Sequence, residues 1–170
     1  MIQEITCFEY AGKVLEKLNP GIFLTTSFEK NTNTMIIGWG GIIVQWGKPI
    51  FIVLVRDSRA TYNLIEKSHE FTVSVPLKSA LLDEIRICGT KSMRELDKFE
   101  TCKFTKVKGR KIDTPIIGEC TLHYECKVIY KQPLNQAMIP EQIKKHYYDK
   151  TANHTVYYGE IVDQYLYTKE

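Results

Sequence analysis

Two strand signals flank a cluster of glycines in residues 35–56, which read MIIGWGGIIVQWGKPIFIVLVR. The second part, residues 49–56, is a continuous apolar run of the kind found in strands buried on both faces. The first part, residues 35–46, is also apolar, and its glycines indicate a bulge or a close approach of another group to the backbone. The stretch therefore predicts two strands of a buried sheet.

Shorter strand signals recur on both sides of that stretch. Residues 21–28 are rich in apolar and β-branched side chains, and the polar residues 30–34 that follow predict a turn. Apolar and polar side chains alternate in residues 120–131, which predicts a half-buried strand with one apolar face. Two more strands are expected at residues 71–75 and 157–165.

Short helices are expected in the gaps between these strands. Ser58 is placed to cap a helix that runs towards Lys67, and Ser79 to cap a second helix that ends at Gly89. Pro140 at a first helical position predicts a third. A set of about six strands without regular strand–helix alternation favours a mainly β, largely antiparallel barrel over a doubly wound parallel sheet.

The composition indicates one globular domain. The chain has 170 residues, of which 44% are hydrophobic, and this excludes a disordered protein. The length gives enough core for a single domain over residues 1–170. A net charge of +3 is too small for a dedicated nucleic-acid binder. We therefore read the basic run at residues 103–111 as a solvated loop, with a nucleic-acid groove as its alternative.

Neither a membrane span nor a secretory leader is evident. No apolar run approaches about 18 residues, and the N-terminus lacks a basic-then-apolar layout. The five cysteines form no Cys-x-x-Cys pair, which favours a reducing cytosol over a disulfide framework. Cys120 and Cys126 lie roughly 20 Å apart along an extended strand, too far to share a zinc ion. We expect a soluble, cytoplasmic protein with no metal site.

The common catalytic signatures are missing from this chain. It has neither Gly-x-Gly-x-x-Gly nor a phosphate-loop pattern, and neither His-Glu-x-x-His nor Gly-x-Ser-x-Gly. A first segment with chemical potential is NTNTMIIGWG, residues 31–40. Its glycine-rich strand offers backbone hydrogen-bonding groups beside Trp39, which suit the rim of a flat heterocycle. A hairpin with a bulge is the simpler alternative.

Two further segments offer cations and hydroxyl groups to an anion. RDSRAT, residues 56–61, lies where a buried strand meets a helix start, and helix N-termini attract phosphate. CGTKSMRELDKF, residues 88–99, places Lys91 and Ser92 in a loop before a short helix that docks by Phe99. The alternatives are an ordinary helix cap with surface arginines and a solvated charge run. Together the three segments match FMN, which has a planar tricycle and a terminal phosphate.

Read jointly, these segments resemble the flavin reductase-like FMN-binding family, and within it the flavoredoxin-type branch. The resemblance spans residues 21–162 and is carried by residues 33–76, 88–99, 119–132 and 154–162. It implies a split β-barrel and a homodimer that holds one FMN per subunit near the dimer interface. Two departures from the related pattern are Ile37, where a smaller or polar residue is common, and Asp57, where proline is common.

The same resemblance implies three groups of FMN-binding residues. Those expected along the isoalloxazine ring are Asn33, Thr34, Met35, Ile36, Ile37 and Trp39. Those expected around the ribityl-phosphate are Arg56, Ser58, Arg59 and Thr61. Those expected in a second loop that closes on the cofactor are Cys88, Gly89, Lys91 and Ser92, with Lys98 beside them.

The resemblance also implies an activity. It is that of an FMN-dependent oxidoreductase, which passes electrons from a reduced donor such as NAD(P)H through FMN to a flavin or a protein acceptor. The alternative is a non-catalytic carrier whose tightly held FMN moves electrons between redox proteins. His154 resembles a C-terminal position close to the flavin face and is the one candidate catalytic residue, with an ordinary strand-edge histidine as its alternative. Neither a nucleic acid nor a membrane is expected as a partner.

Overall fold

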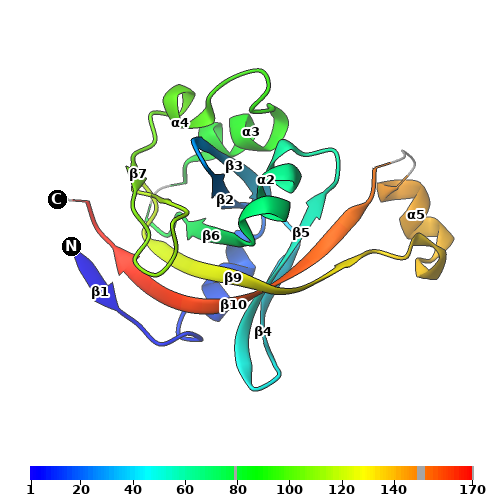
Figure 1. The fold of residues 1–170 in the computed structure, drawn as a ribbon, viewed down its shortest axis with the longest axis horizontal. Coiled ribbons are helices and arrows are strands. Elements are labelled where there is room, and N and C mark those ends of the chain that lie inside the picture. The colour runs from blue at the N-terminus through cyan, green and yellow to red at the C-terminus, as the bar shows by residue number, and fades with distance from the viewer. Residues whose placement is uncertain (79, 149–151, 170) are drawn as a thin grey trace.

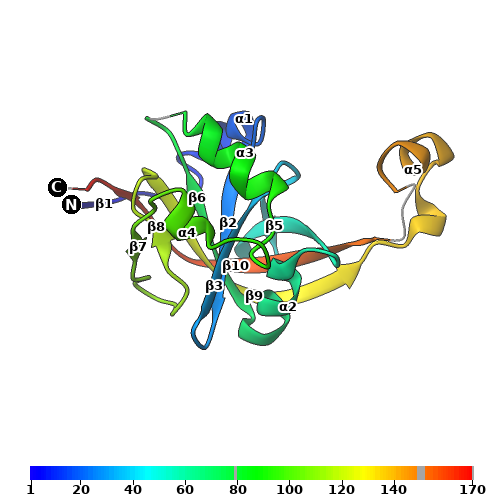
Figure 2. The same cartoon turned by 90° about the horizontal axis from the view of Figure 1, so that it is seen from above.

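The computed structural model describes residues 1–78, 80–148 and 152–169, and most of them form one sheet with short helices around it (Figures 1 and 2). The strands of the sheet are β1 (Ile2–Glu4), β2 (Ile22–Phe28), β3 (Asn31–Ile37), β4 (Gly40–Gln45), β5 (Lys48–Arg56), β6 (Glu70–Val75), β9 (Leu122–Pro133) and β10 (His154–Tyr167). A separate ribbon pairs β7 (Lys106–Val107) with β8 (Ile116–Ile117). The helices are α1 (Ala11–Lys17), α2 (Ala60–Ser68), α3 (Leu82–Thr90), α4 (Lys98–Thr101), the 3-10 turn η1 (Gln136–Met138) and α5 (Glu141–Tyr147).

The sheet is antiparallel at every pairing among the described residues. Its strand order is β3-β2-β6-β9-β10-β5-β4, with β1 added along β10. The end strands β3 and β4 do not pair with each other, so the sheet curves without closing. The prediction of a mainly β, largely antiparallel fold is confirmed. None of the helices in the described ranges is long and apolar enough to cross a membrane.

The strands β9 and β10 are long enough to leave the body of the molecule. Figure 2 shows both running out towards α5, which projects from the body of the molecule. We call residues 134–148 the arm. Within the body all of Leu122–Cys126 is buried, whereas most of residues 127–133 is exposed. The predicted alternation along this strand is therefore wrong, because burial changes along its length rather than between its faces.

A buried carboxylate explains why polar residues of β9 lie inside. Glu125 is fully buried and accepts hydrogen bonds from the backbone N–H groups of Arg110, Lys111 and Ile112. The Tyr165 hydroxyl donates to the same carboxylate at 2.7 Å. The loop that carries the basic run thus covers the second face of β9, and its backbone satisfies the charge that it buries.

The sequence predicts one strand over residues 35–46, and the structure interrupts this strand between β3 and β4. A side chain at Gly40, which has φ +137°, would place its Cβ 2.2 Å from the Ile52 carbonyl oxygen, so only glycine fits. The predicted turn at residues 30–34 is shorter in the structure: only Lys30 of these residues lies in it, together with Glu29, because Asn31–Ile37 pairs with β2 throughout. Asn33 and Thr34 are tolerated inside because Thr61 Oγ1 and the Leu24 carbonyl accept their hydrogen bonds.

The helices start and stop a little away from the predicted residues. No side chain caps α2, whose N-cap is Arg59, so the predicted capping by Ser58 is wrong. Gly89 does not end α3, which continues to Thr90, and the predicted cap Ser79 lies outside the described residues. The short helix α4 is confirmed: Asp97 caps it, and Phe99 is buried. The helix after Pro140 is confirmed as α5.

Candidate functional site

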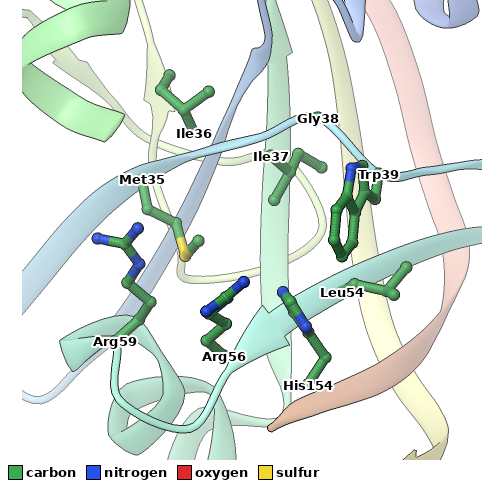
Figure 3. Close-up of a pocket in the computed structure, with 9 residues that line it drawn as sticks. All are labelled: Met35, Ile36, Ile37, Gly38, Trp39, Leu54, Arg56, Arg59 and His154. Carbon is green, nitrogen blue, oxygen red and sulfur yellow. The ribbon is translucent and has the colours of Figure 1, made fainter. Parts of the chain in front are cut away.

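A cavity of about 150 Å³ opens where β3, β5 and β10 end near one another. In Figure 3 the backbone of β3 and the link after it form one side, and three basic or aromatic side chains face them from the other side. The Trp39 ring closes one end. We call this space the ring cavity. Its lining residues are Met35, Ile36, Ile37, Gly38, Trp39, Leu54, Arg56, Arg59 and His154.

Strand pairing brings residues that are far apart in the sequence into this cavity. Arg56 ends β5 and lies directly opposite His154, the first residue of β10. Trp39 lies in the break between β3 and β4, where no neighbouring strand covers it, and it is 38% exposed. Its ring centroid is 4.9 Å from that of His154, so the two rings form a continuous wall.

His154 is a neutral group in this wall at ordinary pH. Burial, assisted by the nearby Arg56 guanidinium, lowers the pKa of its imidazole to about 4. Its Nδ1 atom lies 3.0 Å from the Tyr148 hydroxyl, which fixes the orientation of the ring. The imidazole therefore offers a fixed, uncharged edge to whatever occupies the cavity, rather than a proton donor at neutral pH.

Arg56 connects the ring cavity to the arm. Its guanidinium donates to the Tyr147 carbonyl oxygen at 2.9 Å and lies over the Tyr148 ring. The Tyr147 ring meets Trp39 edge-on at a centroid distance of 5.1 Å. Beyond Trp39 an apolar groove of about 490 Å³ follows the arm. The base of the arm is thus held against one end of the cavity.

A second cavity of about 110 Å³ adjoins the first and shares Met35 and Arg59 with it. The uncapped N-terminus of α2 forms one side, and the segment between α3 and α4 forms the other. Because free helix N–H groups and cationic side chains converge here, we call it the anion cavity. Its lining residues are Asn33, Met35, Ser58, Arg59, Ala60, Thr61, Lys91, Ser92, Met93, Arg94 and Lys98.

Lys98 provides a buried charge at the floor of the anion cavity. Only 4% of this residue is exposed, and its ammonium donates to the carbonyl oxygens of Thr34 and Cys88, both at 2.9 Å. Burial lowers the pKa of its amine. An ammonium has three donors, and within the described residues only two of them are used. The third donor suits an anion in the cavity.

The more exposed cations of this cavity are also free to meet a ligand. Arg59, Lys91 and Arg94 take part in none of the ion pairs formed among the described residues. Asp57, two positions before Arg59, accepts hydrogen bonds from the Asn153 backbone, and Glu95, next to Arg94, is exposed and lines neither cavity. The cavity therefore keeps an excess of positive charge, as a phosphate group requires.

The structure brings nearly all of the predicted site residues to the two cavities. The exceptions are Thr34, Cys88 and Gly89, which line neither of them. The carbonyls of Thr34 and Cys88 hold the Lys98 ammonium, and a Cβ placed on Gly89 would lie 3.6 Å from the Ile36 side chain. These three residues lie behind the cavity walls, and their contact with a cofactor stays a prediction.

Five lining residues were missed by sequence reasoning. Arg94 follows Lys91 and Ser92 by only a few positions. Its place in the same cationic segment could have identified it as a lining residue. Leu54 lies on a buried strand, where nothing in the sequence separates it from the core. The missed residues are Gly38, Leu54, Ala60, Met93 and Arg94.

A comparison of the sequence with known protein families identifies the family of this chain. The sequence profile of the flavin reductase like domain matches residues 16–170 of this chain. The chain belongs to this family. The resemblance read from the sequence is therefore confirmed, and the open antiparallel sheet of this flavin reductase-like chain is the split barrel of its structural neighbours.

Individual relatives agree with this assignment. The flavin reductase-like chain is 29% identical over 150 residues to an uncharacterised protein of Archaeoglobus fulgidus, a match that covers 88% of this chain and 74% of the relative. A flavoredoxin of Methanosarcina acetivorans is 26% identical, with a TM-score of 0.66 over 88% of this chain and 69% of that structure. An FMN-binding domain of a flavin reductase-like enzyme from Shewanella baltica shares the fold, with a TM-score of 0.68 over 98% of this chain and 77% of that structure, at 20% identity.

Proposed function

We propose that this chain binds FMN and serves as an FMN-dependent oxidoreductase that passes electrons from a reduced donor such as NAD(P)H to a flavin or a protein acceptor. The observation that carries the proposal is the joining of the two cavities through Met35 and Arg59. One cavity lies between strand backbone and an aromatic wall, and the other collects cations at a helix N-terminus. FMN has a planar ring and a terminal phosphate, so its two ends match the two cavities in kind and in order.

The residues at hand fit the phosphate end of FMN well. The unused donor of Lys98, the N-terminus of α2 and the side chains of Arg59 and Lys91 supply hydrogen bonds and charge from several directions. Asn33 donates to Thr61 Oγ1 at 2.7 Å and so ties β3 to the start of α2. This bond fixes the start of α2 against β3 before any ligand arrives.

The ring end of FMN would lie against the backbone of the link between β3 and β4. Peptide groups around Gly38 are available there, since neither β3 nor β4 includes that residue. When bound, FMN supplies the electron-transfer chemistry. The chain's own part is to hold the ring between the Met35 side and the Trp39–His154 wall, and to leave a face open to a second reactant. His154 then acts as a neutral positioning group.

The test of cofactor binding is direct. Purified protein should carry a flavin absorption band, or should quench the fluorescence of added FMN in a titration with one site per chain. Protein that is colourless and leaves FMN fluorescence unchanged would overturn the proposal. Mass analysis of the released flavin then separates FMN from riboflavin and from FAD.

A second candidate function is a non-catalytic FMN electron carrier, and the similarity to a flavoredoxin favours keeping it. The two functions differ in whether a nicotinamide can reach the flavin. We expect the flavin absorption to bleach when NADH or NADPH is mixed anaerobically with the holoprotein. If neither nucleotide bleaches it while dithionite does, the carrier function replaces the reductase function.

We further propose that the chain works as a homodimer, and the exposed apolar residues of the arm support this. Met138 is 80% exposed and Ile143 is 47% exposed, beside the apolar groove that begins at Trp39. Single soluble chains rarely leave such residues together in water. Light scattering should give the mass of two chains, and Ile143→Asp should shift the protein to one chain. A wild-type protein with the mass of one chain would contradict the proposal.

A further inference from the structure

Two cysteines lie in contact beside the anion cavity. The Sγ atoms of Cys88 and Cys102 are 3.9 Å apart, and both thiols are free. A disulfide has an S–S distance of about 2.0 Å, so each sulfur has to move by only about 1 Å to form the bond. The pair lies in a small hydrophobic cluster with Phe99 and Phe104.

The positions of the two cysteines bracket the cationic segment of the site. Cys88 lies in the last turns of α3, and Cys102 is the C-cap of α4. Between them the chain carries Lys91, Ser92, Met93, Arg94 and Lys98, all of which line the anion cavity. The Lys98 ammonium already joins the two helices by donating to the Cys88 carbonyl. A disulfide would add a covalent link between the same two helices.

We propose that Cys88 and Cys102 form a reversible redox pair, which a peroxide oxidises to a disulfide that locks the anion-binding segment. The bond itself rests on the geometry of the thiols alone. Its effect on the cofactor rests on the proposed FMN function, in which this segment holds the phosphate.

The chemistry balances with hydrogen peroxide as the oxidant. The Cys102 thiolate attacks one peroxide oxygen, the O–O bond breaks, and the sulfur becomes a sulfenic acid while the departing hydroxide takes a proton to form water. The Cys88 thiolate then attacks this sulfur and expels a second hydroxide, which also becomes water. In sum two thiols lose two electrons and two protons, and one peroxide yields two waters. Dithiothreitol reverses the change by thiol–disulfide exchange.

The surroundings make Cys102 the first residue to react. Cys102 is half-buried, whereas only 1% of Cys88 is exposed. Burial raises the pKa of the Cys88 thiol to about 12 and also raises that of Cys102. The Lys98 ammonium on α4 opposes this rise, and Glu84 on α3 adds to it. Because the thiolate is the reactive form, the oxidation is slow at neutral pH and accelerates as the pH rises.

The experiment begins with the reduced wild-type protein, treated with hydrogen peroxide and then alkylated under denaturing conditions. We expect alkylation to fall from five cysteines to three, and digestion to yield one peptide pair that joins Cys88 to Cys102. Dithiothreitol should restore all five. Individually alkylated Cys88 and Cys102 after oxidation, or crosslinks only between separate chains, would overturn the proposal.

Matched variants separate this pair from the other cysteines. Cys120 lies in the same hydrophobic cluster, and Cys7 is half-buried elsewhere. Cys120→Ala and Cys7→Ala should keep the crosslink, whereas Cys88→Ala and Cys102→Ala should each lose it. A crosslink that survives in both of the last two variants would contradict the assignment. Having two such variants keeps the test valid if one of them fails to fold.

The effect on the cofactor has its own readout. Oxidised wild-type protein should release FMN about threefold more slowly than reduced protein, because a preordered segment loses less freedom on binding. The Cys102→Ala variant should show no change in release on peroxide treatment. A crosslink in a chain that never binds FMN refutes the proposed function and leaves the redox pair standing. FMN binding without a crosslink refutes the redox pair.

Discussion

The anion cavity and the ring cavity are neighbours, yet they are built in different ways. The anion cavity draws most of its lining from two short segments, residues 58–61 and 91–98. The ring cavity draws on the ends of β3, β5 and β10, and the arm stands at its rim. The first is preorganised by hydrogen bonds within the body, and the second depends on long-range strand pairing. Binding strength should therefore come mainly from the anion cavity, and access for a second reactant from the ring cavity.

Riboflavin separates the two contributions, because it has the ring of FMN and lacks the phosphate. A change confined to the anion cavity should weaken FMN and spare riboflavin. A change confined to the ring cavity should weaken both ligands equally. The following variants are measured by fluorescence titration with both ligands.

The largest effect is expected for Arg59→Ala, because Arg59 lines both cavities. Loss of a charge-assisted contact to phosphate costs about 3 kcal/mol, so FMN affinity should fall roughly 100-fold. Riboflavin affinity should fall only a few-fold. The control is Arg86→Ala, since Arg86 pairs with Asp83 on the exposed face of α3 and should be neutral. Equal losses for FMN and riboflavin would place the phosphate away from Arg59.

A smaller and more selective effect is expected for Lys91→Ala. Lys91 is exposed and lines only the anion cavity. Its loss should weaken FMN about tenfold, which corresponds to roughly 1.4 kcal/mol, and should leave riboflavin unchanged. Lys30→Ala removes an exposed cation at the β2–β3 turn and serves as the control. If Lys91→Ala weakens riboflavin binding as strongly as FMN binding, then Lys91 does not act on the phosphate, and the assignment of the phosphate to the anion cavity is wrong.

Trp39→Ala tests the ring cavity. The Trp39 ring closes one end of this cavity and contacts His154 and Tyr147. Loss of an aromatic wall that is 38% exposed should cost about 1 kcal/mol, or roughly fivefold in affinity, for FMN and riboflavin alike. Trp46→Ala removes the other tryptophan, which lines neither cavity, and should change neither affinity. A loss seen only with FMN would contradict a role for Trp39 beside the ring.

Local sequence was enough to predict most of the anion cavity. Ser58 and Arg59 stand before a helix, and Lys91 and Ser92 stand after one, so their place at helix ends follows from short-range signals. The prediction that was wrong, the capping of α2, also concerned a local feature. The sequence favours Ser58 as a cap, and the structure shows no side-chain cap at the α2 N-terminus, so no side chain competes there with an anion. A good capping residue and a good phosphate ligand look alike in sequence.

The ring cavity could be predicted only through the resemblance to a family. The pairing of Arg56 with His154 joins residues about one hundred positions apart, and no periodicity contains that information. The break at Gly40 follows from a close approach to the Ile52 carbonyl, which exists only once β4 and β5 pair. Lys98 illustrates the same limit, because its burial depends on carbonyls from β3 and α3. Contacts between residues far apart in the sequence determine these features, and local secondary-structure propensity does not predict them.

The smallest expected effect is a difference in pH dependence between the two ligands. A phosphate monoester has its second pKa near 6, so FMN loses one of its two negative charges as the pH falls through that value. The cations of the anion cavity then hold it less strongly, and FMN affinity should fall a few-fold between about pH 7.5 and 5.5. The His154 imidazole has its pKa lowered to about 4, so it stays neutral over this range and adds no charge beside the ring. Riboflavin affinity should therefore stay constant in the same buffers. A riboflavin affinity that changes in parallel with that of FMN would show that a group in the ring cavity titrates near pH 6, and the Trp39–His154 wall would then be charged when it binds the ring.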